Sequence, residues 1–463
     1  MPFAPGTFTW ALGIEDTCVY PPAGGTPLDE HLLTDHHIRM TEDVTMVAGL
    51  GAGALRYGLS WPLAHPEPGV FDWSAIDPVV VLAGELGLTL VADLVHYGTP
   101  TWLPGAFADP GYPDAVAAFA GAVAERYPGQ LTCFTPLNEP VTTASFCGLR
   151  GVWPPYRTGW AGWVEVVVPI ALGVVRSVAA IRRAQPSAVI VHVEAATDVC
   201  SSDPALADQV DLLRGVGWLP TDLVLGRVDE AHPLHGWLLA NGASPDQLAE
   251  LVAGPASVDV LGVNYYPDLT PRRLVDVEGE VVQVSYDRGA AGLREAVGGF
   301  AQRYGLPVAI SETSVEGDDR RRAAWLAASV DEVRALRAAG YDVRGYTWWP
   351  LLDFVDWSWA AGGRNVEEFA VATRLADGSV VVGHSPSLGD PADGRAPFLR
   401  RMGIVRLDEL SPGGSLIRTP TPVADDFARL AHGRPTSRGD GRPPTAPAVR
   451  LAGPPTKAID EAS

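Results

Sequence analysis

The sequence predicts an α/β protein built as a single (β/α)8 TIM barrel with extended βα loops. Short apolar runs recur along the chain, and longer amphipathic stretches typical of helices lie between most of them. The runs are almost continuously apolar, as expected for strands that are covered on both faces. Repeated strand–helix units with right-handed connections close most simply into a barrel. A doubly wound open sheet is the alternative, but no glycine-rich phosphate turn follows the first run.

Eight of these runs are expected to form the barrel strands, and five stretches between them show the clearest helical periodicity. Asp318 and Asp319 place negative charge at the start of the last predicted helix, and Gly340 follows its end as a C-cap residue would. The predicted strands are residues 8–14, 54–61, 88–97, 133–140, 189–195, 258–266, 307–313 and 344–353. The predicted helices are residues 41–50, 76–86, 114–127, 163–185 and 320–339.

The length of 463 residues would allow about three domains of roughly 150 residues each. One barrel of about 250 residues with long insertions is the competing interpretation, and the strand pattern favours it. We therefore expect residues 1–433 to form the barrel. Residues 359–397 are rich in Gly, Asp and Ser and predict a long loop or an insertion. Residues 434–463 are rich in Pro, Gly and Arg and predict a disordered tail.

The composition argues against several classes of partner. A net charge of −21 opposes binding to nucleic acid. The start of the chain shows no signal peptide, and we find no apolar run of the roughly 18 residues that a membrane span needs. We therefore expect a soluble, cytoplasmic protein without a membrane partner, whose oligomeric state the sequence leaves open.

Neither a metal nor a cofactor is expected from the residue pattern. The four cysteines are widely spaced and are interpreted as small buried apolar residues. His31, His36 and His37 are grouped, but they lack matching ligands and are predicted to lie on a helix surface. Glu194 ends the fifth predicted strand as either a substrate contact or a buried paired acid.

Polar and aromatic residues gather where the predicted strands end. In a barrel, the carboxyl ends of the strands are where catalytic groups are found. Loop solvation or helix capping would explain any one of these residues alone, but it explains the whole set poorly. The set consists of Arg56, Trp61, His96, Asn138, Glu139, Asn264, Tyr266, Glu312, Trp349 and Asp353.

Two carboxylates of this set, Glu139 and Glu312, suit the cleavage of a glycosidic bond. That reaction needs one protonated carboxyl group, which donates to the leaving oxygen, and one ionised carboxylate. The two glutamates end the predicted fourth and seventh strands, so a barrel would point both into one mouth. Arg56 is expected to pair with Glu312 and to favour its ionised form. Asn138 offers an amide for a sugar hydroxyl.

Aromatic side chains are dense at the same strand ends, and their faces would suit the C–H faces of a sugar ring. Core packing is the competing explanation and accounts for Trp10, Trp73 and Trp325. The aromatic residues expected near the sugar site are Trp61, Tyr97, Trp102, Trp153, Tyr266, Trp348, Trp349, Trp357 and Trp359.

Several motifs in chain order resemble glycoside hydrolase family 1, the β-glucosidase family. LNEP at residues 137–140 is similar to the family's acid/base motif, and ISETS at 310–314 resembles its nucleophile motif. The resemblance spans about residues 8–430. The further matching segments are FTW (8–10), LRYGLSWP (55–62), His96-Tyr97, LGVNYY (261–266), GYTWWPLLD (345–353), MGIV (402–405) and RTP (418–420).

The resemblance implies a retaining hydrolase of β-glycosides, in which Glu139 is the acid/base and Glu312 the nucleophile. It also implies that Arg56 and Tyr266 orient the nucleophile. The substrate-binding residues expected on this basis are His96, Asn138, Asn264, Trp349, Asp356 and Trp357.

Two departures from the family pattern touch the glycone, the sugar that reacts. Where the family carries a Gln that binds sugar hydroxyls, this chain reads DTCVY at residues 16–20, so that contact is either missing or replaced by Glu15 or Asp16. Asp356 stands where the family has a glutamate that binds sugar hydroxyls. The resemblance thus implies a β-glycosidase whose glycone need not be glucose. A deoxy or otherwise modified sugar fits these departures. The Ser, Lys and Tyr residues of the family's phospho-sugar branch are not apparent, so a 6-phosphoglycoside is not expected.

Three functions remain open from the sequence. The first is hydrolysis of a small-molecule glycoside or oligosaccharide. The second is transglycosylation by the same glutamates. The third is sugar binding by a barrel that has lost catalysis, and the presence of both glutamates and their neighbours argues against it.

Overall fold

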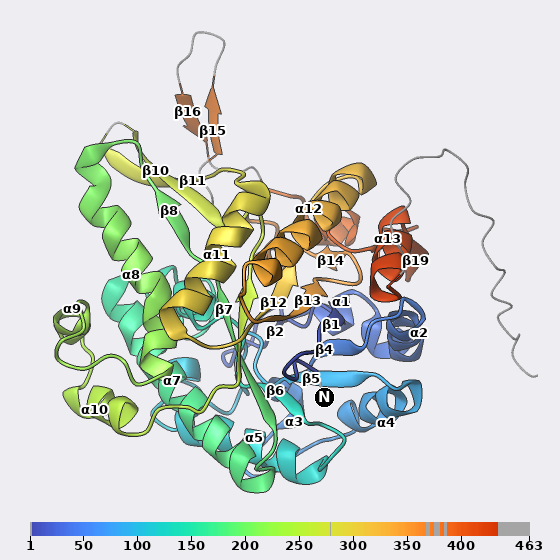
Figure 1. The fold of residues 1–463 in the computed structure, drawn as a ribbon, viewed down its shortest axis with the longest axis horizontal. Helices are drawn as coiled ribbons and strands as arrows, with labels where there is room; N and C mark the ends of the chain where they lie inside the picture. The colour runs from blue at the N-terminus through green and yellow to red at the C-terminus, as the bar shows by residue number, and fades with distance from the viewer. Residues whose placement is uncertain (1, 278, 367–370, 375–379, 384–386, 434–463) are drawn as a thin grey trace, which may run out of the picture.

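Eight parallel strands close into a barrel in the computed structural model, which describes residues 2–277, 279–366, 371–374, 380–383 and 387–433 (Figure 1). The order around the barrel is β1, β4, β5, β6, β7, β9, β12 and β13, which returns to β1. Every predicted strand run overlaps one of them, so the predicted fold class is confirmed. Their bounds are β1 Thr9–Gly13, β4 Ala54–Gly58, β5 Thr89–Asp93, β6 Cys133–Thr135, β7 Val189–Ala195, β9 Val260–Asn264, β12 Val308–Thr313 and β13 Val343–Trp348.

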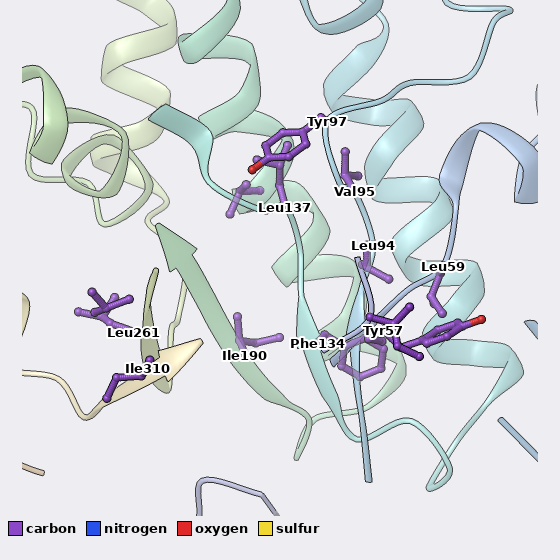
Figure 2. Close-up of a cluster of buried hydrophobic side chains, with 14 of the residues drawn as sticks. Tyr57, Leu59, Leu94, Val95, Tyr97, Phe134, Leu137, Ile190, Leu261 and Ile310 are labelled. Carbon is purple, nitrogen blue, oxygen red and sulfur yellow. The ribbon is translucent and has the colours of Figure 1, made fainter. Parts of the chain in front are cut away.

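Alternation along the strands divides the apolar side chains into two layers. One cluster lies in the barrel interior. It consists of small or medium-sized side chains and one phenylalanine: Phe3, Ala11, Ala54, Val91, Cys133, Val191, Val193, Val260 and Ala309. The neighbouring positions belong to a larger cluster between the strands and the surrounding helices. Figure 2 shows members of this outer cluster, among them Ile190 on β7, Leu261 on β9 and Ile310 on β12. Side chains therefore alternate along each strand between the barrel interior and the surrounding helices. Only those that point into the interior can reach the mouth of the barrel from inside.

The five predicted helices are present, with ends that differ by a few residues. Asp318 caps the last of them, because its Oδ1 accepts the backbone N–H of Arg321 at 2.8 Å. The helices are α2 His36–Gly49, α4 Ile76–Leu86, α5 Tyr112–Arg126, α7 Gly159–Ala184 and α12 Asp319–Ala338.

Two long helices were missing from the predicted set, α8 (Ala207–Val224) and α11 (Gly289–Tyr304). Pro220 lies inside α8, and Gly292 and Gly298 lie inside α11, residues that disfavour helices intrinsically. Packing against the barrel stabilises them instead. The shorter helices are α1 Glu30–Leu33, α3 Trp61–Ala64, α6 Pro140–Ala144, α9 His235–Ala240, α10 Pro245–Ala253 and α13 Pro422–Ala431.

Small sheets outside the barrel shape the loops around its mouth. A three-stranded sheet joins β8 (Asp198–Cys200), β10 (Pro271–Val277) and β11 (Glu280–Ser285), next to α8 (Figure 1). The predicted loop or insertion at residues 359–397 contains the hairpin of β15 (Val371–Arg374) and β16 (Val380–Gly383). The predicted tail, residues 434–463, lies outside the described residues. The remaining pairs are β2 Cys18–Val19 with β3 Leu28–Asp29, β14 Phe354–Val355 with β17 Leu399–Arg400, and β18 Val405–Glu409 with β19 Leu416–Pro420.

The expectation that no apolar run reaches the length of a membrane span was wrong. Among the described residues, α7 is long and apolar enough to cross a membrane. In the fold, 67% of its most apolar window is buried. The helix packs mainly against α5, so its apolar character is accounted for by core packing.

The interpretation of the cysteines as buried residues holds for Cys18, Cys133 and Cys147 but not for Cys200, and the prediction for His36 was wrong. Cys18, Cys133 and Cys147 are buried and Cys200 is half-buried, and all of them are free thiols. His36 is fully buried rather than exposed on a helix surface: its Nδ1 lies 2.9 Å from Asp43 and its Nε2 lies 3.0 Å from the Tyr57 hydroxyl.

A buried ion pair ties the C-terminal hairpin to α2 and gives a stability prediction. Both carboxylate oxygens of Asp43 accept from Arg418, at 2.6 and 2.9 Å, and both side chains are fully buried. Arg418→Leu should lower the free energy of unfolding by about 3–5 kcal/mol, because it leaves the Asp43 charge buried without this partner. Arg406→Leu removes the half-exposed pair with Asp408 and should cost no more than about 1 kcal/mol. Chemical denaturation of both variants tests this, and equal losses would contradict it.

Candidate active site

Glu312 reaches the mouth of the barrel because β12 is irregular where it ends. Ile310 is in register with Val263 on β9, but Glu312 is in register with the very next residue of that strand, Asn264. Ser311 is therefore an extra residue, and its hydroxyl donates to Asn264 Oδ1 at 2.6 Å. Such bulges re-aim side chains next to functional sites.

Glu139 is placed by a sharp turn between β6 and α6. Its backbone adopts a left-handed conformation, with φ of 44°, and it immediately precedes Pro140 at the start of α6. A non-glycine residue rarely adopts this conformation, which is concentrated at functional sites. The backbone N–H of Glu139 donates to Val193 O of β7, which fixes the turn against the neighbouring strand.

The carboxylate of Glu312 is held at both oxygens. Arg56 donates to Oε1 in a buried ion pair, the contact expected from the sequence, and the Tyr266 hydroxyl donates to Oε2 at 2.7 Å. Arg56 reaches it from inside the barrel because it shares the parity of Ala54 on β4. Burial raises the pKa of Glu312 to about 8, while Arg56, His96 and Tyr266 pull it down and Glu139 adds to the rise. The cation therefore moderates the effect of burial but does not cancel it.

The carboxylate of Glu139 has a different set of partners, which are neutral donors. The Tyr97 hydroxyl donates to Oε2 and Asn264 Nδ2 donates to Oε1, each at 2.7 Å. Asn138 links the two glutamates: its Oδ1 accepts from Arg56 at 2.7 Å, and its Nδ2 donates to Tyr97 at 2.9 Å. The two carboxylates thus belong to one connected network, with the fixed positive charge on the Glu312 side.

Asp16, Asp93 and His96 form the one group among the described residues whose ligand atoms lie close enough to hold a metal ion, within 4.8 Å of one another. His96 Nδ1 lies 2.6 Å from Asp16 and 3.1 Å from Asp93, and Arg56 also donates to Asp93. Burial raises the pKa of Asp16 to about 6, although His96 opposes this. Arg56 already supplies positive charge to this cluster. The cluster of Asp16, Asp93 and His96 therefore suits an ion-pair network better than a metal site.

Trp349 and Glu15 define the closed end of the site. The Trp349 indole N–H donates to Glu15 Oε2 at 2.7 Å, and Thr17 donates to the other oxygen at 2.6 Å. The Trp349 ring stacks on His96 with an interplanar angle of 2° and also lies under the Arg56 guanidinium. These contacts hold the indole rigidly as one wall of the site.

A cavity of about 610 Å³ opens above these groups and contains both glutamates. The structure places most of the predicted site residues on its wall, namely His96, Glu139, Asn264, Tyr266, Glu312, Trp349 and Trp357. Among the described residues that line it, Arg56, Asn138 and Asp356 do not appear. Arg56 and Asn138 lie behind the wall and bond to residues on it.

Asp356 is not among the described residues that line the cavity, although it was expected to bind substrate. Its Oδ1 accepts the backbone N–H of Ser358 at 2.8 Å, which caps a short 3₁₀ helix, and Arg400 lies 3.6 Å from Oδ2. Glu194 also lies off the wall. It is fully buried on β7. Its carboxylate accepts hydrogen bonds from the backbone N–H groups of Ala195 and of Val141, which lies in the first turn of α6. Its parity on β7 explains this, because Val193 points into the barrel.

Sequence reasoning assigned too many aromatic residues to the site and missed others. Trp61 and Trp348 are fully buried in the core, and Trp153 packs against Tyr97 instead of lining the cavity. The missed wall residues include Trp160 and Trp163 at the start of α7, and Phe354, Arg400 and Met402 near β14 and β17. Apolar positions on helices give no sign in the sequence that they face a cavity.

The fold and this site together define a class of protein. A closed (β/α)8 barrel that presents two buried glutamates from β6 and β12 in a single cavity, beside an indole wall, is the architecture of a barrel glycosidase.

Comparison with known proteins shows which glycosidase family the chain resembles. The family model "Glycosyl hydrolase family 1" matches residues 28–216. Thermostable beta-glucosidase B of Thermobispora bispora is 26% identical over 380 residues, which cover 72% of this chain and 75% of the relative. A bifunctional beta-D-glucosidase/beta-D-fucosidase of Bifidobacterium breve is 22% identical over 385 residues, covering 71% and 82% of the two chains.

A solved structure shows the same fold. The family 1 β-glucosidase from Thermotoga maritima superimposes with a TM-score of 0.73 at 17% identity, covering 94% of this chain and all of its own. The chain thus resembles glycosyl hydrolase family 1 in the matched family model and in its curated relatives, and it shares the fold of a solved member. It is therefore a glycoside hydrolase that acts on β-glycosides.

Proposed function

We propose that this enzyme hydrolyses β-glycosides with net retention of configuration, with Glu312 as the nucleophile and Glu139 as the acid/base. The observation that carries the proposal is the pair of glutamates in one cavity, each held at both oxygens by different partners. In this proposal, residues 1–433 form the catalytic barrel.

The reaction would run in two displacements. In the first, Glu312 attacks the anomeric carbon while Glu139 donates its proton to the glycosidic oxygen. The C–O bond to the leaving group breaks, and a covalent glycosyl-enzyme forms. In the second, Glu139 takes a proton from water, the resulting hydroxide oxygen bonds to the anomeric carbon, and Glu312 leaves as a carboxylate. The developing positive charge on the sugar favours the ionised form of Glu312.

The neighbouring residues have roles that follow from their contacts. Arg56 and Tyr266 each bind one oxygen of Glu312 and would fix the direction of its attack. Trp349 would stack on the sugar ring, because it is locked against His96 at the closed end. We propose that His96, Asn138, Asn264 and Trp357 bind the glycone, with Asn138 acting from just behind the wall.

The glycone is proposed to differ from glucose at its far edge. Phe354 and Met402 contribute apolar surface to the cavity, whereas the Asp356 carboxylate is engaged by the backbone N–H of Ser358 and is not among the described lining residues. The Arg400 guanidinium on the same wall is engaged by Glu316 at 2.8 Å. Apolar surface beside Phe354 and Met402 favours a deoxy sugar over one with an additional hydroxyl group, which would lose hydrogen bonds to water. The named activity of the Bifidobacterium breve relative, which includes β-D-fucosidase, supports this direction.

A panel of 4-nitrophenyl β-glycosides in gluco, galacto, fuco, xylo and rhamno configurations tests the proposal. We expect turnover on at least one member, with the β-anomer of the free sugar appearing first in a proton NMR time course. First appearance of the α-anomer would contradict retention. Absence of turnover combined with sugar binding would instead favour an inactive sugar-binding barrel. Products carrying an added alcohol acceptor, formed in preference to free sugar, would favour a transglycosidase.

Tyr266→Phe should move the acidic limb of the pH profile of kcat/KM to higher pH. Glu312 must be ionised to attack, and the Tyr266 hydroxyl lowers its pKa, so loss of this donor raises the pH needed for activity. The expected displacement is about one pH unit. Tyr265→Phe is the matched control, because the Tyr265 hydroxyl donates to Gly289 O instead. An unchanged limb in Tyr266→Phe, or an equal displacement in the control, would contradict the assignment.

A further inference from the structure

The cavity extends well beyond the two glutamates, on the side of Glu139. The residues that follow Glu139 in the chain continue its wall: Val141 and Thr142 lie on α6, and Phe146 and Leu149 lie on the turn that leads to α7. The start of α7, the end of β7, α8 and the β10–β11 hairpin complete it. We call this part of the cavity the outer chamber.

The position of Glu139 decides which part of the substrate enters the outer chamber. A general acid must lie within hydrogen-bonding reach of the oxygen that it protonates. That oxygen belongs to the leaving group, or aglycone. The ring of the glycone occupies the other side, between Glu312 and Trp349. The wall that continues from Glu139 is therefore the wall that contacts the aglycone.

Hydrocarbon dominates this wall. The principal side chains are Phe146, Trp160, Trp163, Leu213, Val216 and Val282, which come from the turn after α6, α7, α8 and β11. Val216, Phe146 and Trp163 are almost completely buried, whereas Leu213 and Val282 are half-buried nearer the opening.

The arginines of this wall, Arg150 and Arg272, are already engaged with the protein. The Arg272 guanidinium on β10 donates to Ser285 Oγ at 3.0 Å. The Arg150 guanidinium donates to Val366 O and lies 4.4 Å from the centroid of the Phe146 ring. Thr142, Ser145, Thr197 and Gln283 supply a few short or peripheral polar groups. A second sugar unit carries hydroxyl groups around its whole edge, and each one buried without a partner costs free energy. An apolar group would instead gain by leaving water.

We infer that the natural leaving group of this enzyme is an apolar, non-carbohydrate aglycone, which the outer chamber binds. This inference rests on the proposed function, because it assumes that Glu139 protonates the leaving group. The three-stranded sheet of β8, β10 and β11 supplies Val199, Val281 and Val282 to the wall, so this addition to the barrel helps to select the substrate.

A series of alkyl β-glycosides, from methyl to octyl, tests the inference on the glycone identified by the panel above. The chemistry of the leaving alcohols is similar, so differences in kcat/KM report binding of the chain. We expect kcat/KM to rise by up to about fourfold for each methylene buried in the chamber. A β-linked disaccharide of the same glycone should be cleaved more slowly than the octyl glycoside.

Two matched pairs of variants locate the effect. Leu213 and Leu212 are adjacent, half-buried residues of α8, but only Leu213 is found among the described residues of the cavity wall. Leu213→Gln should reduce kcat/KM for the octyl glycoside at least about fivefold and change the methyl glycoside less than about twofold. Leu212→Gln should change neither. A second pair consists of Val282→Thr and Val275→Thr. The two valines are paired across the β10–β11 hairpin, but only Val282 is among the described residues of the cavity wall.

The outcomes separate this inference from the proposed function. Turnover of 4-nitrophenyl glycosides with a flat alkyl series, or with the disaccharide as the better substrate, overturns the apolar aglycone and leaves the proposed function intact. Equal effects of the two variants within each pair also overturn it. Absence of turnover on every 4-nitrophenyl glycoside and every alkyl glycoside overturns both.

Discussion

Glu312→Ala is expected to abolish hydrolysis, with kcat/KM falling on the order of 10⁴-fold or more, as for other enzymes that lose a nucleophile. The carboxylate that forms the glycosyl-enzyme is gone, and the methyl group leaves a space next to the anomeric carbon. Azide is small enough to enter that space and to attack the same face of the sugar. Added azide should therefore restore turnover of an activated aryl glycoside and release an α-glycosyl azide.

The configuration of the azide product makes this test specific. A single displacement inverts the anomeric centre, so an α-azide identifies Glu312 as the group that normally attacks from that face. Glu85→Ala, which removes an exposed carboxylate of α4, is the control and should match the parent enzyme. Undiminished hydrolysis by Glu312→Ala without azide would exclude Glu312 as the nucleophile, provided that the variant melts like the parent.

Glu139→Ala should show an effect that depends on the leaving group. A 2,4-dinitrophenolate leaves without protonation, so the first displacement should be nearly preserved for that substrate. An alkyl glycoside needs the proton, and its kcat/KM should fall by about 10²–10⁴-fold, the usual contribution of general acid–base catalysis. The second displacement also loses its base, so the glycosyl-enzyme should accumulate and give a burst of dinitrophenolate.

Azide distinguishes the two glutamates. In Glu139→Ala, azide would attack the glycosyl-enzyme from the side of the missing acid/base and release a β-glycosyl azide, the opposite of the Glu312→Ala product. Gln is the more conservative substitution at Glu194, which is buried behind this site and accepts backbone N–H groups. Glu194→Gln should keep the parent dependence on leaving group. An equal loss of kcat/KM for dinitrophenyl and alkyl substrates in Glu139→Ala would contradict its role as the acid.

The pattern of side chains in the sequence was sufficient to predict the barrel and to place the two glutamates at its mouth. Strands buried on both faces need continuous apolar runs, and that requirement is local, so the runs could be located one by one. Glu139 and Glu312 could be identified because a carboxylate does not contribute to core packing. A carboxylate at the end of a core strand therefore indicates a site at the mouth of the barrel. The pairing of Arg56 with Glu312 was also expected from the sequence, since the two residues carry opposite charges and both lie on barrel strands.

Other features depend on contacts between segments that are far apart in the chain. Asp356 was expected on the cavity wall, but its carboxylate caps the 3₁₀ helix that follows it, and the apolar surface near it comes from Phe354 and Met402. His36 was expected on a surface, but the hairpin that carries Arg418 covers that end of α2, where His36 bonds to Asp43. A side chain's orientation in such places is set by its partners, and the partners are not encoded locally.

The sequence by itself determined which elements form and which glutamates stand at the mouth, because hydrophobic periodicity and strand ends are local properties. Only the tertiary structure decided how those groups are used. The extra residue Ser311 turns Glu312 into the cavity. Burial raises the pKa of Glu312 to about 8 although Arg56 opposes it. Distant helices and the β10–β11 hairpin line the outer chamber with hydrocarbon. Desolvation and packing depend on everything that surrounds a group, so they exist only once the chain has folded.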